Sequence, residues 1–104
     1  MNEDRVAKLK AFLEKDPDDS FTRYALALEY ASQGDYQIAI AYLQELLHRD
    51  PDYVAAYQQL AVSFAGLGKR KEAVEILGKG IAVATKQGDL HARNEMQEAL
   101  DELN

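Results

Sequence analysis

The strongest constraint in this sequence is an internal repeat with a period of 34 residues. The two prolines, Pro17 and Pro51, both stand in the phrase Asp-Pro-Asp and are 34 residues apart. Gly34 and Gly68 have the same separation. Further pairs in this register are Leu26 and Leu60, Ala27 and Ala61, Tyr30 and Phe64, Ala39 and Ala73, and Leu43 and Leu77. A fixed period of this length predicts a stack of similar units, each of which buries its apolar face against its neighbours.

The first half of each unit has the composition of a helix. Residues 21–32 and 54–67 are rich in Ala, Leu and aromatic side chains and contain no proline. Each run ends close to Gly34 or Gly68, and glycine readily adopts the left-handed conformation that ends a helix. We therefore expect one helix in each run.

The second half of each unit is expected to form another helix, over 36–48 in the first unit. That helix ends at Asp50-Pro51, because proline cannot extend the helical hydrogen-bond ladder and disfavours helix in the residue before it. Thr85 stands at the corresponding place in the second unit. The second-unit helix can therefore run from Arg70 to about Lys86 and stop before Gly88.

Two more helices are expected outside the repeats. The segment before the first repeat ends in the same Asp-Pro and has the pattern of the second half of an incomplete repeat. Its apolar side consists of Val6, Leu9, Phe12 and Leu13. The last segment is amphipathic, and its polar outer face suits the end of a stack. We expect one all-α domain over 1–104 with about six helices, divided into a half-repeat helix at 3–15, repeats at 20–53 and 54–87, and a capping helix at 89–103.

The repeat resembles the tetratricopeptide repeat, a 34-residue helix–turn–helix unit with the pattern W-x2-L-G-x2-Y…A-x3-F…P. The resemblance covers 20–87 and extends by half a repeat on each side. Arg23 and Tyr57 stand where the pattern has Trp, while Arg70 and Thr85 replace the Tyr and Pro of the second unit. The matching residues are Leu26, Ala27, Tyr30, Gly34, Tyr36, Ala39, Leu43 and Pro51 in the first unit and Leu60, Ala61, Phe64, Gly68, Ala73 and Leu77 in the second.

The resemblance implies antiparallel helix pairs that stack as a short right-handed superhelix. The first helix of each unit would line the concave face, and domains of this kind generally act as scaffolds or adaptors that hold a peptide or a partner's helix. The groove positions implied by the family are largely apolar here, with Ser32 and Gln58 as hydrogen-bonding groups. The candidate partner-binding residues are Phe21, Tyr24, Leu28, Ser32, Gln58 and Val62.

One function known in such domains is disfavoured by these groove positions. Repeat domains that clamp the acidic C-terminus of heat-shock chaperones place Lys and Asn on the groove face. Here Tyr24 and Leu28 stand in the first unit and Gln58 and Val62 in the second. Binding of a chaperone tail is therefore not expected.

Three alternatives stay open for the apolar side chains of the first helix. Phe21, Tyr24 and Leu28 can form an open partner site, can be covered by the helix at 3–15, or can be covered by a second copy of the chain. The second functional hypothesis is accordingly a self-associating structural module, such as a homodimer formed through the groove or through a terminal helix. A third is a cryptic enzyme.

Composition argues against other classes of function. There are 18 acidic and 12 basic residues, a net charge of −6, which disfavours the neutralisation of nucleic-acid phosphates. The chain has no Cys and only two histidines, so we expect no metal, no cofactor and no catalytic residues. The acidic residues of the Asp-Pro-Asp turns are expected to cap helix N-termini. No apolar run approaches the roughly 18 residues of a membrane span, and we expect a cytoplasmic protein without membrane contact.

Overall fold

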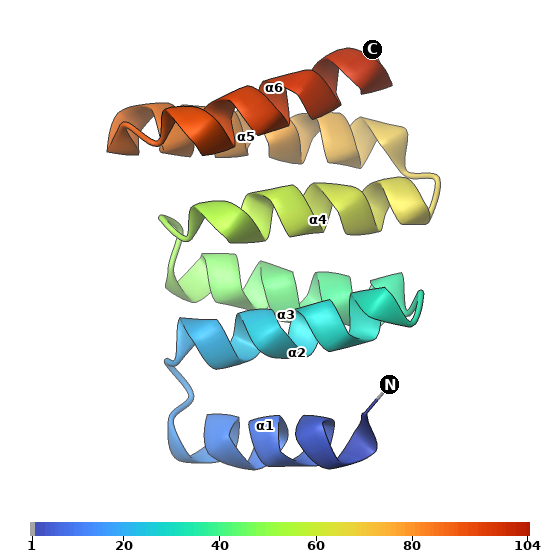
Figure 1. The fold of residues 1–104 in the computed structure, drawn as a ribbon, viewed down its shortest axis with the longest axis vertical. Coiled ribbons are helices and arrows are strands. Elements are labelled where there is room, and N and C mark those ends of the chain that lie inside the picture. Colours follow the sequence, from blue (N-terminus) through green and yellow to red (C-terminus); the bar gives the residue numbers. More distant parts are fainter. Residues whose placement is uncertain (1) are drawn as a thin grey trace.

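A computed structural model describes residues 2–104, which form six α-helices and no strand (Figure 1). This confirms the all-α prediction and the number of helices. The helices are α1 (Glu3–Lys15), α2 (Ser20–Ser32), α3 (Tyr36–Arg49), α4 (Val54–Gly66), α5 (Arg70–Gln87) and α6 (Leu90–Leu103).

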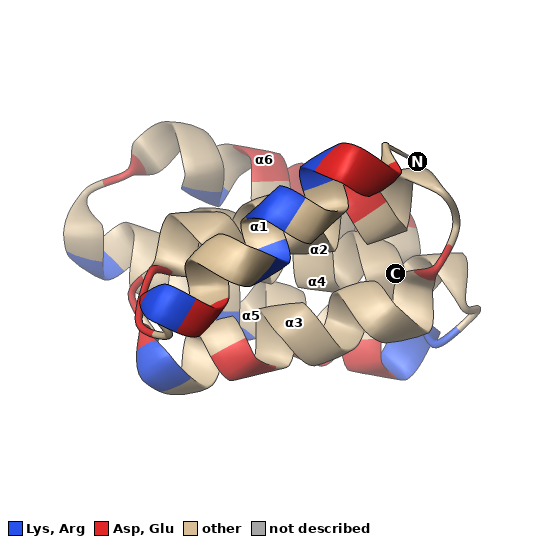
Figure 2. Cartoon of the chain, turned by 90° about the horizontal axis from the view of Figure 1, so that it is seen from below, with Lys and Arg blue, Asp and Glu red and all other residues tan. Residues whose placement is uncertain are grey.

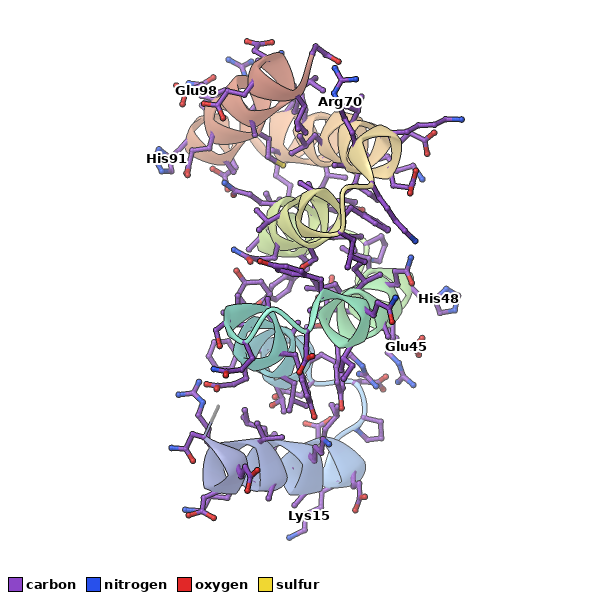
Figure 3. The ribbon with its side chains drawn as sticks, turned by 90° about the vertical axis from the view of Figure 1, so that its right-hand side faces the viewer. Lys15, Glu45, His48, Arg70, His91 and Glu98 are labelled. Carbon is purple, nitrogen blue, oxygen red and sulfur yellow. The ribbon has the colours of Figure 1, made fainter. Side chains whose placement is uncertain are left out.

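The helices pack in chain order, each against the next, and α4 additionally contacts α2 and α6. Consequently α2, α4 and α6 lie on one side of the stack, and α3 and α5 lie on the other (Figures 1 and 3). The stack measures 38 × 29 × 19 Å. Seen along its length, α1 crosses the end of the stack obliquely and does not continue the alignment of the other helices (Figure 2).

Equivalent turns end the first helix of both units. Gly34 and Gly68 have φ values of +79° and +75°, which a side-chain-bearing residue rarely adopts. The N–H groups that follow, of Asp35 and Lys69, both donate to a carbonyl in the preceding helix, 3.0 and 2.9 Å away. These bonds satisfy carbonyls at the helix end that would otherwise lack a partner. The repeated glycines therefore end the first helix of each unit, as the sequence predicts.

Residues of the repeat register make up most of the core. The small side chains of Ala27, Ala39, Ala61 and Ala73 are buried, which allows paired helices to approach closely. The large side chains that are almost fully buried are Leu26, Leu43, Leu46, Leu60, Leu77 and Met96. Five of these are leucines of the two repeats, and Met96 is contributed by α6. One contiguous cluster joins α2 to α6, and a smaller cluster joins α1 to the first repeat.

The two residues that replace the Trp of the repeat pattern, Arg23 and Tyr57, play the same structural role as each other although their side chains differ. Arg23 and Tyr57 are both buried. The Arg23 guanidinium donates a hydrogen bond to the carbonyl of Pro17, and the Tyr57 hydroxyl donates to the carbonyl of Pro51 at 2.7 Å. Each side chain thus fills the helix interface and satisfies the carbonyl of the proline turn that precedes its unit.

The expectation that the turn acids cap helix N-termini is wrong: Asp19 occupies the N-cap of α2 but its side chain accepts no cap hydrogen bond, and the N-cap of α4 is Tyr53. Asp18 accepts a 2.7 Å hydrogen bond from Arg49, and Asp50 accepts a 2.8 Å bond from the hydroxyl of Ser20. These carboxylates connect the turn before the first unit to the turn after it. Their partners lie 30 residues or more away along the chain, which is why local sequence patterns do not reveal them.

Candidate functional site

The side of the stack formed by α2, α4 and α6 carries exposed apolar side chains at repeated positions. Leu28 of α2 and Val62 of α4 are 34 residues apart, and 38% and 50% of their surfaces are exposed. A single exposed apolar side chain is ordinary on a protein surface, so the two residues are informative only as a pair. Their matched positions on neighbouring helices indicate an apolar strip that crosses the stack.

Tyr24 forms a partly buried element of this strip. Its ring lies 5.4 Å from the ring of Tyr53, centroid to centroid, in a tilted arrangement. Burial raises the pKa of Tyr24, and the neighbouring Tyr53 raises it further. Because Tyr53 immediately precedes α4, this aromatic pair connects α2 to the start of the second unit. Tyr24 therefore helps to hold α2 against the turn that precedes α4.

A pocket of about 210 Å³ lies between α4 and α6 and contains two of the predicted residues, Gln58 and Val62. Its walls are mainly apolar, with Glu102 among the lining residues. The Gln58 side-chain amide donates a 3.4 Å hydrogen bond to Glu95 of α6. The remaining lining residues are Ala61, Ala65, Leu77, Ala99 and Leu103.

Helix α6 makes one end of this surface acidic. It carries four acidic residues and one arginine. Figure 3 shows Glu98 and His91 projecting from α6 on the side where α2 and α4 lie. His91 lies 2.6 Å from Glu95, a contact that becomes an ion pair when the imidazole is protonated. The acidic residues are Glu95, Glu98, Asp101 and Glu102.

Sequence reasoning treated these acids as the solvent face of a cap and missed their position beside the apolar strip. Met96 of α6 is fully buried, as Leu60 of α4 is. Helix α6 therefore occupies the position that the first helix of a third repeat would have. The two residues 36 positions apart do not follow the 34-residue register. Helix α5 is four residues longer than α3 and the turn after it is two residues shorter, so allowing for a net shift of two residues would have aligned α6 with α4.

The structure does not bring all six predicted residues into one site. Ser32 is exposed, but its hydroxyl donates to the carbonyl of Glu29 at 2.7 Å. Phe21 is 68% exposed and lines a different groove, with Phe12 of α1. Helix α1 therefore does not cover Phe21, and its own buried residue, Val6, packs in a cluster with Leu26. The predicted residues divide into the strip on α2 and α4 and the separate groove beside α1.

Neither a metal-binding cluster nor a helix able to span a membrane is found within residues 2–104. In that range, no group of three or more His, Asp or Glu side chains is arranged to hold a metal ion. None of the helices described there combines the length and the apolar character needed to span a membrane.

Comparisons with known proteins match most of the chain. Two family profiles, each described as tetratricopeptide repeat, match residues 30–93 and 1–55. Among solved structures, a tetratricopeptide repeat domain protein from Salinibacter ruber is 36% identical with a TM-score of 0.80. The match covers 86% of this chain and 90% of that one. No curated protein matches the chain significantly.

Two further solved structures are similar to this chain. A protein from Bordetella parapertussis is 30% identical with a TM-score of 0.84, over 94% of this chain and 85% of that one. The MamA protein is 25% identical with a TM-score of 0.75. That match covers 81% of this chain but only 46% of MamA.

Proposed function

The chain belongs to the tetratricopeptide repeat family, and from this premise we propose that it is an adaptor whose strip on α2, α4 and α6 binds a segment of a partner protein. The family is generally a protein–protein interaction module and typically a non-catalytic scaffold. The proposed contact residues on the strip are Tyr24, Leu28, Gln58 and Val62. The cytoplasm, expected from the sequence, stays the predicted location.

The observation that carries this proposal is the pair of exposed apolar side chains, Leu28 and Val62, at matched positions on neighbouring helices. Grooves of this kind bind a helix or an extended segment through a few apolar anchors. The aromatic pair of Tyr24 and Tyr53 gives the strip a rigid wall, and rigid aromatic side chains are enriched among the residues that dominate binding energy.

The charge of α6 narrows the chemistry of the partner. A segment that follows the strip from α2 to α6 passes from apolar side chains to the carboxylates of Glu95, Glu98 and Glu102. We infer that the partner segment carries apolar residues followed by Lys or Arg, because unlike charges across an interface favour the correct partner and its orientation. A short stack offers limited area, so we expect a dissociation constant on the order of micromolar.

A selection experiment tests this function. A phage library of random short peptides is selected on the immobilised protein, and enriched peptides are measured by fluorescence anisotropy. Peptides that combine apolar and basic residues are expected. The double variant Leu28→Asp/Val62→Asp is expected to weaken their binding by roughly tenfold or more, because it places carboxylates where apolar anchors dock.

A matched control is available on the other side of the stack. Ile38 of α3 is 43% exposed, so Ile38→Asp introduces the same charge at a similar exposure. This variant is expected to bind the selected peptides as the unmodified protein does. The proposal is contradicted when no peptide is enriched, when the enriched peptides are acidic, or when Ile38→Asp weakens binding as much as the double variant.

A further inference from the structure

Helix α1 presents an apolar face that the complete units keep covered. Leu9 and Phe12 correspond in the repeat register to Leu43 and Leu46 of α3, which are fully buried. In α3 these residues lie between α2 and α4, whereas the main neighbour of α1 is α2 alone. Leu9 is accordingly only half-buried, and 52% of the surface of Phe12 is exposed.

Phe21 extends this apolar face onto α2. It is 68% exposed, the largest value among the exposed large apolar residues within 2–104. Phe21, Phe12 and Leu9 line one open groove of about 730 Å³ between α1 and the start of α2. Two exposed phenylalanines in one groove are unusual for a surface that meets only water, and such patches mark interaction sites.

The charges around this groove indicate what covers it. Two anions, Asp4 and Asp19, and two cations, Arg5 and Lys8, line the same groove, so their charges cancel. Arg5 already forms a 2.9 Å ion pair with Glu29. A strongly basic or strongly acidic partner therefore has no net electrostatic attraction to this groove, whereas a basic partner is attracted to the acidic helix α6. A second identical groove, turned by a two-fold rotation, brings both signs of charge and the same apolar side chains.

The surface at the opposite end of the stack argues against association of copies head to tail. In α6 the exposed side chains after Leu90 are all polar, so they do not offer an apolar surface for Phe12 and Phe21. Association through unlike ends would also leave an unpaired end in every assembly that does not close into a ring, whereas a two-fold contact uses one face twice and is closed. We propose that two copies of this chain form a symmetric dimer through the α1–α2 groove, in which each copy covers Phe12 and Phe21 of the other.

Sedimentation equilibrium over a dilution series tests the dimer. Phe12→Asp and Phe21→Asp are each expected to raise the dissociation constant of the dimer by at least about tenfold. The control is Leu90→Asp in the first turn of α6, because Leu90 is 56% exposed and, like Phe21, lies in the first turn of its helix. Asp is favourable near a helix N-terminus, so neither Phe21→Asp nor Leu90→Asp is expected to unfold its helix.

A second measurement locates the interface directly. The chain lacks cysteine, so a spin label can be attached at Lys8→Cys in the groove or at Asn94→Cys on α6. Intermolecular dipolar coupling is expected for the first label and not for the second. The proposal is overturned if the protein stays monomeric up to about millimolar concentration. It is also overturned if Leu90→Asp weakens the dimer as much as Phe21→Asp, or if only the label on α6 shows coupling.

Discussion

The two ends of the stack are closed by helices of nearly equal length that are attached very differently. At one end, α6 inserts Met96 into the main core, and the Arg70 side chain of α5 donates a hydrogen bond to the carbonyl of Leu103. At the other end, α1 buries Val6 in a separate small cluster. The ammonium of Lys10 adds a contact 5.6 Å from the centre of the Tyr30 ring. A terminal helix can thus complete the core or can leave an apolar face available for association.

The largest expected effect concerns the α6 end. Met96→Ala should lower the free energy of unfolding by about 2–5 kcal/mol, because it removes a fully buried side chain and leaves a cavity. Chemical denaturation followed by circular dichroism measures this loss. A loss below about 1 kcal/mol would show that α6 is not part of the main cooperative core.

Two glycines of α5 sharpen the description of the same end. A Cβ on Gly80 would lie 2.5 Å from the sulfur of Met96 and 2.7 Å from the Cβ of Tyr57, whereas a Cβ on Gly78 would have open space. Gly80→Ala should therefore destabilise the protein by about 1–3 kcal/mol. Gly78→Ala should stabilise it by about 1 kcal/mol through helix propensity. Thermal denaturation of the two variants measures this contrast, and equal shifts would contradict the close packing of α5 against α6.

A smaller effect is expected at the α1 end. Val6→Ala removes two methyl groups from a small cluster and should cost at most about 1.5 kcal/mol. Amide hydrogen exchange is the more informative measurement, because α1 can open without unfolding the other helices. Below the concentration at which copies associate, the α1 amides should exchange faster than those of α6. The reverse order would contradict the unequal attachment of the two ends.

The smallest effect concerns the tyrosines between the two ends. Burial raises the pKa of Tyr24, Tyr53 and Tyr57, so the folded state holds their protons more tightly than the unfolded state does. Their contribution to stability is complete below the ordinary tyrosine pKa and is lost as the pH rises through the raised values. Denaturation at increasing alkaline pH should show this loss, and Tyr24→Phe should reduce it. A stability that rises over this range would contradict the assigned burial.

Most of the fold could be predicted because the repeat register fixes both the helices and their buried faces. The first helix of the second unit, expected over 54–67, ends at Gly66, one residue early. The long helix expected to reach about Lys86 ends at Gln87. Local signals were sufficient here, since glycine and proline determine helix ends through backbone conformation.

The surfaces were predicted less well because they depend on which neighbours are present. Phe12 lies on the apolar side of its helix, yet it is exposed because α2 is the only helix within residues 2–104 that packs extensively against α1. The sequence did not place Phe21 and Val62 in different grooves. It also did not distinguish Gly80 from Gly78, because the difference arises from contacts with α6 and Tyr57.

The central claim is that the apolar strip and the α1–α2 groove have separate occupants. Amide chemical shifts of the isotopically labelled protein test it in two titrations, one by dilution and one with a peptide obtained from the selection on phage. Dilution should shift residues of α1 and the start of α2, and the peptide should shift residues around Leu28, Val62 and α6. The account is contradicted if both titrations shift the same residues, or if the peptide shifts only those around Phe12.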